Sequence, residues 1–215
     1  MKIKISVVLI FVIFMSCKAL LCQDNKYTAT ILQDFFKDSS RYNCYKPRVS
    51  KDYLNDSLRL SSAIDYINSN YNANSYFMML HIKEYHYVIY ESISDSLKII
   101  QYYYHLKECH CADDWSLLTL HSQVDYNVGK LILHSGKKSL PVLKLLLYDT
   151  DGIIMCRGTE GNTLTYGYHL RIKDFAYRYA AIILGENPFF LRTREERDGL
   201  IDALIKKYPE YLRLD

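Results

Sequence analysis

The first candidate for chemistry in this sequence is the short cluster Cys109-His110-Cys111, with His105 one helical turn before it. Thiolates and imidazoles are the ligands from which zinc builds a tetrahedral site. Only one residue separates the two cysteines, however, whereas structural zinc sites space their cysteines more widely and add a matching second half. We therefore interpret the cluster as a helix end with incidental thiols. The alternative is an envelope metal-binding protein or enzyme centred on residues 105–114, with a metal site made of His105, Cys109 and Cys111.

Asp113 and Asp114 form a pair of carboxylates, a residue type that serves general acid–base catalysis. Adjacent residues at a helix start point apart, and a helix N-cap accounts for one of them. The seven histidines form no H-E-x-x-H pair, and the chain has no P-loop, G-x-S-x-G or dinucleotide fingerprint. The sequence therefore predicts no catalytic residue and no cofactor, and it favours a non-enzymatic function.

The segment 149–169 is the strongest candidate for binding. It holds four of the eight glycines and interrupts two apolar helical patterns. Long loops in helical domains are uncommon, and they serve either as binding elements or as insertions that fold back on the helices. Polar and tyrosine side chains on a rigid base suit the recognition of a protein. The expected binding residues are Arg157, Glu160, Asn162, Tyr166, Tyr168 and His169.

Tyrosine is the most unusual component of the composition, with 21 residues against 8 Phe and 1 Trp. Tyrosines usually pack at helix interfaces with the hydroxyl at the rim, but an exposed row of them can bind a glycan. A tyrosine-lined glycan-binding module is therefore a further alternative.

Apolar residues recur with helical spacing from about residue 54 to the end, so we expect an all-α fold of about eight helices with one long loop. Ser94 is a plausible N-cap, Gly136 and Gly185 stand where helices end, and Thr193 with Glu196 forms a capping box. Residues 23–53 are irregular, with one helix near their start. The expected helices cover residues 56–69, 74–89, 94–107, 115–120, 126–135 with Asp125 as the cap, 140–148, 172–184 and 194–208.

Two of these segments resemble the helices of a HEAT repeat. Leu140-Pro141 through Tyr148-Asp149 resembles the first helix, which is apolar, carries an early proline and ends at an aspartate. Ile172-Lys173 through Leu184-Gly185 resembles the second helix, although the turn between the two is much longer than in such repeats. Over residues 139–186 the chain is similar to uncharacterised exported bacterial proteins with HEAT-like helical hairpins. This resemblance implies a HEAT-like α-hairpin array over residues 54–215 and no defined activity.

The chain begins with a segment typical of a secretory signal peptide. Lys2 and Lys4 precede an apolar run from Ile5 to Met15, which is too short to span a bilayer comfortably. We expect residues 1–22 to be removed, with cleavage after Cys22 or Ala19. The alternative is lipidation at Cys17, where Ser16-Cys17 resembles the end of a bacterial lipoprotein box. The mature chain is therefore expected to be periplasmic or secreted, or anchored to the membrane by a lipid.

The charge and cysteine content limit the classes of partner that the chain can bind. The whole chain has 27 basic and 24 acidic residues, but three lysines lie in residues 1–22, so the mature chain is neutral. A neutral chain lacks the basic excess that nucleic-acid binding requires, and no transmembrane span is expected in it. Cys44, Cys109, Cys111 and Cys156 remain, and the sequence does not choose among their disulfide pairings. The sequence thus predicts an exported protein-interaction module of the cell envelope, with an unidentified protein partner.

Overall fold

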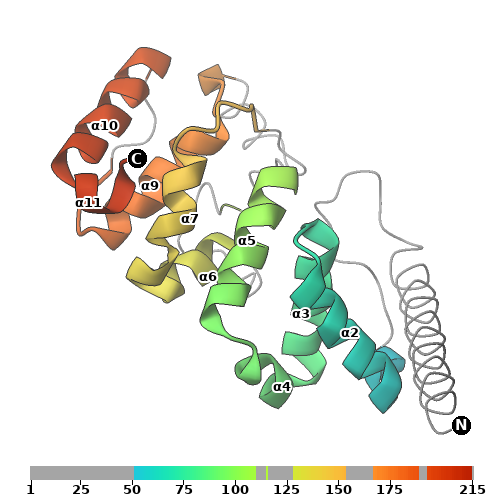
Figure 1. Ribbon diagram of the computed structural model, residues 1–215. Coiled ribbons are helices and arrows are strands. Elements are labelled where there is room, and N and C mark those ends of the chain that lie inside the picture. Colours follow the sequence, from blue (N-terminus) through green and yellow to red (C-terminus); the bar gives the residue numbers. More distant parts are fainter. Residues whose placement is uncertain (1–50, 110–114, 116–127, 154–166, 189–192, 215) are drawn as a thin grey trace, which may run out of the picture. The chain divides into compact units, whose positions relative to one another are not determined.

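The computed structural model describes residues 51–109, 115, 128–153, 167–188 and 193–214 (Figure 1). The expected all-α class with about eight helices is confirmed. Among these residues the only paired extended backbone is an isolated antiparallel bridge between Gly152 and Arg171. The chain divides into two compact units, Met1–Ser39 with Pro47–Asn70, and Ser40–Lys46 with Tyr71–Asp215.

The described part of the first unit is a short 3-10 helix, η1 (Lys51–Leu54), followed by helix α2 (Ser57–Ser69). The Asp56 side chain begins α2 by accepting hydrogen bonds from the backbone N–H groups of Leu58 and Arg59, at 2.8 and 3.3 Å. Because an N-cap acceptor satisfies donors that no helical turn can reach, this residue marks the start of α2. The helix predicted at 56–69 is thereby confirmed.

The second unit begins with α3 (Ala73–Tyr85), α4 (Tyr87–Ser92) and α5 (Asp95–Cys109). The prediction of one helix over 74–89 was wrong, because the backbone leaves helical geometry at His86, with φ −134° and ψ 53°. The apolar pattern continues through this break, so periodicity alone did not reveal it. Helix α5 starts as predicted, with the Ser94 hydroxyl accepting from Leu97 N–H at 3.3 Å.

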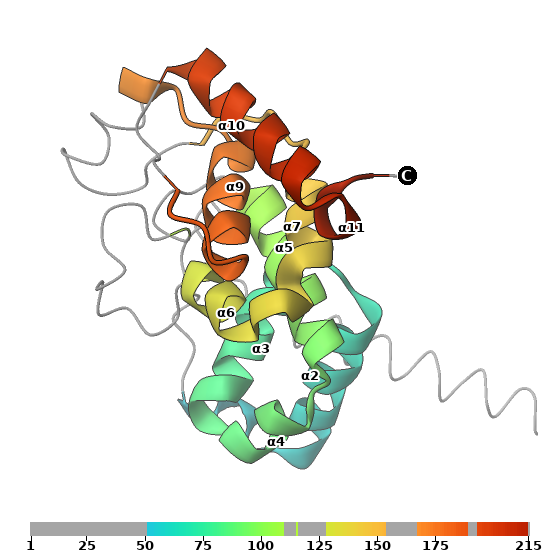
Figure 2. The same ribbon diagram turned by 90° about the vertical axis from the view of Figure 1, so that its left-hand side faces the viewer.

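The remaining described helices of the second unit are α6, η2, α7, α9, α10 and α11 (Figure 2). Gly136 and Gly185 have left-handed backbones, with φ 56° and 82°, as expected for residues that end helices. Helix α7 ends at Leu146, two residues before the expected end. Pro209 starts a new helical turn after α10. The bounds are Val128–Ser135 for α6, Gly136–Ser139 for η2, Leu140–Leu146 for α7, Ile172–Ile183 for α9, Arg194–Lys207 for α10 and Pro209–Leu212 for α11.

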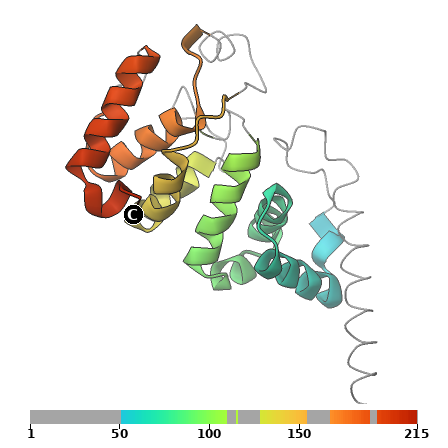
Figure 3. The same ribbon diagram turned by 45° about the horizontal axis from the view of Figure 1, so that its top comes forward.

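Helix α9 is central to this unit, because it packs against α6, α7 and α10 (Figure 3). The fully buried ring of Trp115 lies against Phe175 and Tyr179 of α9, with ring centroids 5.5 and 5.7 Å apart. The Tyr179 hydroxyl donates to the Trp115 carbonyl. Helices α7 and α9, which carry the HEAT resemblance, pack directly on each other. A HEAT-like array of hairpins stays a prediction.

Two expectations fall wholly or largely outside the described residues. These are the signal segment 1–22 and the irregular segment 23–53, of which only residues 51–53 are described. Of the helix expected at 115–120, only Trp115 is described. Among the described helices, none combines the length and the apolar character that crossing a bilayer requires.

Candidate functional site

The two ends of the 149–169 loop are joined at its base. Ile153 N–H donates to the Leu170 carbonyl at 3.0 Å, and Ile172 N–H donates to the Asp151 carbonyl at 2.9 Å. Lys173 N–H continues the series by donating to the Asp149 carbonyl at 3.0 Å. Ile153 and Leu170, which the first of these hydrogen bonds joins, are both buried. The loop therefore leaves and re-enters the helical body through one hydrogen-bonded stem that leads directly into α9.

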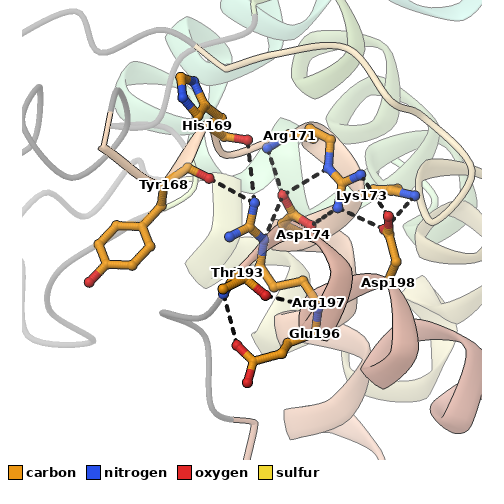
Figure 4. A network of polar contacts seen from close by, with 9 residues as sticks. All are labelled: Tyr168, His169, Arg171, Lys173, Asp174, Thr193, Glu196, Arg197 and Asp198. Atoms are coloured by element: carbon orange, nitrogen blue, oxygen red, sulfur yellow. Dashed lines mark hydrogen bonds and ion pairs between the residues drawn. The ribbon is translucent and has the colours of Figure 1, made fainter.

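A buried ion pair lies where this stem becomes α9 (Figure 4). Asp174 is fully buried, and its carboxylate accepts from Arg171 at the backbone N–H, at Nε and at Nη2, over 2.9, 3.2 and 2.8 Å. Asp174 is the third residue of α9, and Arg171 is the residue just before the helix. The Asp174 carboxylate thus satisfies the free backbone N–H of Arg171 and also binds the Arg171 side chain. Two-point guanidinium–carboxylate pairing fixes orientation as well as distance.

A second carboxylate, from α10, extends the ion pair. Asp198 accepts from Arg171 Nη2 and Nη1 at 2.7 and 3.2 Å, and its Oδ1 lies 2.7 Å from Lys173 Nζ. The hydrogen bond from Arg171 is the largest reason that the pKa of Asp198 falls from 3.8 to about 2. Burial by itself would lower the pKa of Arg171, but hydrogen bonds to Asp174 and Asp198 outweigh it and raise that pKa. The charged form of each partner is therefore stabilised by the other.

Arg197 of α10 connects the same network to the end of the loop. This side chain is 1 % exposed; its Nε lies 3.1 Å from Asp174 Oδ2, and its Nη2 donates to the carbonyls of Tyr168 and His169 at 2.8 and 3.4 Å. His169 has a left-handed backbone, with φ 48°, a conformation that costs a non-glycine residue about 1–3 kcal/mol unless its surroundings impose it. The hydrogen bonds from Arg197 Nη2 to the Tyr168 and His169 carbonyls supply such a constraint.

The side chains of Tyr168 and His169 point away from the buried charges (Figure 4). Both residues are exposed, Tyr168 to 37 %. The backbone of these two residues is thus held by a buried cation, while their side chains face outward. We name Tyr168, His169, Arg171, Asp174 and Arg197 the loop anchor.

The structure brings together two of the six binding residues predicted from the sequence, Tyr168 and His169. The other four, Arg157, Glu160, Asn162 and Tyr166, lie outside the described residues. The charged residues of the loop anchor were not among the binding residues predicted from the sequence. One signal was present: Arg197 occupies a position on the stripe that α10 buries through Ile201 and Leu204, and an arginine there indicates a buried ion pair.

His105, one of the three residues of the alternative metal site, packs as part of the apolar core. His105 is fully buried between α3 and α5, stacked on Tyr76 with ring centroids 4.0 Å apart and edge-on to Phe77 at 5.1 Å. Cys111 and the side chain of Cys109 lie outside the described part of the chain. Within the described part, no three His, Cys, Asp or Glu side chains are grouped as metal ligands would be.

The chain was compared with models of protein families, with curated proteins and with solved structures, and none of them matches it.

Proposed function

We propose that this protein is an exported, non-enzymatic interaction module that binds a protein partner through the 149–169 loop. The observation that supports this most strongly is the loop anchor. Two charged side chains that are almost fully buried, Asp174 and Arg197, hold the base of a surface loop in a strained conformation. Buried charges are costly unless they are paired, so a chain that places them beneath a loop gains a fixed backbone there.

A fixed backbone is useful for recognition because binding then loses less conformational entropy. Ordering a flexible side chain or loop at an interface costs free energy that is subtracted from the affinity. Tyr168 and His169 are presented on backbone that is already ordered, and a tyrosine offers a large amphipathic contact with few rotatable bonds. Arg157, Glu160, Asn162 and Tyr166 complete the proposed binding surface.

The proposal is tested by capturing binding partners from a cell-envelope extract with the full mature chain. The wild type is compared with Tyr168→Ala and His169→Ala, and with the control Tyr87→Ala. Tyr87 is an exposed tyrosine on α4, which forms no part of the loop anchor. We expect one partner to bind stoichiometrically to the wild type and to the control, and to bind at least tenfold more weakly to the two loop variants. Equal binding by all four proteins would refute the proposal.

Export is proposed on the basis of the N-terminal segment, and it is tested separately. The intact mass of protein from a periplasmic preparation distinguishes cleavage after Ala19, cleavage after Cys22 and acylation at Cys17. The same measurement under native conditions detects a retained zinc ion. An uncleaved chain would contradict export, and one zinc ion per chain would favour the metal alternative at residues 105–114.

A further inference from the structure

Helix α7 packs against α5, α9 and α11, and its remaining side exposes apolar residues. Pro141, Leu145 and Tyr148 lie four and three residues apart, so they share one face of α7 and of the turn that continues it. Leu145 is 47 % and Tyr148 46 % exposed, and Pro141 is exposed as well. Single exposed apolar residues are common, but three along one face form a stripe that a partner can cover.

The charges beside this stripe on η2 and α7 are all basic. The segment 128–148 contains four lysines and no acid. Lys137 is exposed and Lys144 is half-buried, and each lies four residues before a member of the stripe, so both flank it. Lys138 is exposed too, but it is paired with Asp95 at 2.5 Å. We name the following residues the basic stripe: Lys137, Pro141, Lys144, Leu145 and Tyr148.

The corner between α3 and α4 exposes apolar residues among acids instead. Val88 is 83 % exposed, the largest value among the large apolar side chains that the structure describes, and Tyr85 is 40 % exposed. Glu84 and Glu91 are exposed as well. The segment 84–96 contains three acids and neither lysine nor arginine. We name Glu84, Tyr85, Val88 and Glu91 the acidic corner.

We propose that the acidic corner of one copy of this chain binds the basic stripe of a second copy. Each surface offers apolar side chains together with charges of one sign, and the two signs are opposite, so the surfaces complement each other. Like charges oppose the contact of either surface with itself, so two different surfaces meet. A bilayer of anionic lipids would attract the stripe but repel the corner. This inference is independent of the loop and of the proposed function.

The self-association should be weak, because each surface presents only a few apolar side chains. Interfaces below about 1,200 Å² are typical of transient complexes. We expect a dissociation constant on the order of tens of micromolar, and weaker association at high salt, which screens the exposed charges. Sedimentation velocity of the full mature chain from about 1 µM to about 1 mM brackets this value.

Two variants, measured separately and as a mixture, identify the surfaces. Val88→Asp alters the acidic corner and Leu145→Asp alters the basic stripe, and both positions are exposed, so the fold tolerates either change. Each variant alone should associate at least tenfold more weakly than the wild type. An equimolar mixture should associate better than either variant alone, because each supplies the intact surface that the other lacks.

The matched control is Leu58→Asp, which places the same charge at an apolar position of α2 that is 67 % exposed. It should associate like the wild type. The proposal is overturned if the wild type stays monomeric up to about 1 mM, or if Val88→Asp or Leu145→Asp associates as strongly as the control. It is also overturned if the mixture of the two associates no better than each variant alone.

Discussion

Replacing Asp174 by asparagine is the sharpest perturbation of the loop anchor. The substitution keeps the size of the side chain but removes the charge that two buried guanidinium groups share, those of Arg171 and Arg197, which are 3 and 1 % exposed. Breaking a buried ion pair by removing one partner costs about 3–5 kcal/mol, because an uncompensated charge is left in the interior. Domains of this size have a total stability of about 5–15 kcal/mol.

The matched control is Asp198→Asn. Asp198 accepts from the same Arg171 at a similar distance, 2.7 Å against 2.8 Å, but its side chain is 41 % exposed. Water replaces the lost partner there, so we expect a cost below about 1 kcal/mol. Both substitutions therefore remove a carboxylate charge from the same guanidinium, one in the interior and one at the surface, and Asp174 in addition caps α9 and pairs with Arg197.

Both variants are measured by urea unfolding followed through the emission of Trp115, the only tryptophan of the chain. Its ring contacts Phe175 and Tyr179 of α9, the helix that carries Asp174, so the probe reports on the affected element. With a urea dependence of about 2 kcal/mol per molar, Asp174→Asn should lower the unfolding midpoint by about 2 M without changing the slope.

A double-mutant cycle tests the physical cause. Arg197→Met removes the second buried cation, so in the Asp174→Asn background it should cost about 1–3 kcal/mol less than in the wild type. Either of two results would show that the buried charges do not stabilise the loop anchor. One is an Asp174→Asn cost no larger than that of Asp198→Asn. The other is additive behaviour of Asp174→Asn and Arg197→Met.

Further predictions concern acid stability, helix capping and backbone strain, all measured through Trp115. Because the pKa of Asp198 is lowered from 3.8 to about 2, its contribution to stability is complete above pH 3.8 and is lost as the pH falls towards 2. The difference in stability between the wild type and Asp198→Asn should therefore be constant from about pH 5 to 8 and disappear near pH 2, and a loss already at pH 5 would contradict the ion pair. Thr193→Ala should destabilise α10 by about 1 kcal/mol, since the hydroxyl accepts from the third helical N–H at 3.3 Å, whereas Thr193→Ser should be nearly neutral. Gly185→Ala and Gly199→Ala should change the free energy of unfolding in opposite directions. Neither new Cβ meets an atom within 4 Å, but only Gly185 has a left-handed backbone, with φ 82°. We expect a loss of about 1 kcal/mol at Gly185 and a gain of about 0.5–1 kcal/mol at Gly199 inside α10, and equal effects would show that backbone strain is not the cause.

The sequence determined the features whose cause is local. Asp56, Ser94 and Thr193 begin helices, and Gly136 and Gly185 end them, because each acts on backbone groups within a few residues of itself. The all-α class follows from apolar residues at helical spacing, which is also local. The position of the loop between two such helices could be read for the same reason.

Only the tertiary structure decided which distant residues meet. Asp174 and Arg197 belong to different helices, and their pairing depends on how α10 packs on α9. Lys98 of α5 lies 4.3 Å from the centroid of the Tyr90 ring on α4, and this contact likewise joins two different helices. The energy of a buried charge depends on the partner that packing brings to it. A sequence shows the charge itself, while the fold determines whether that charge is buried and paired or exposed.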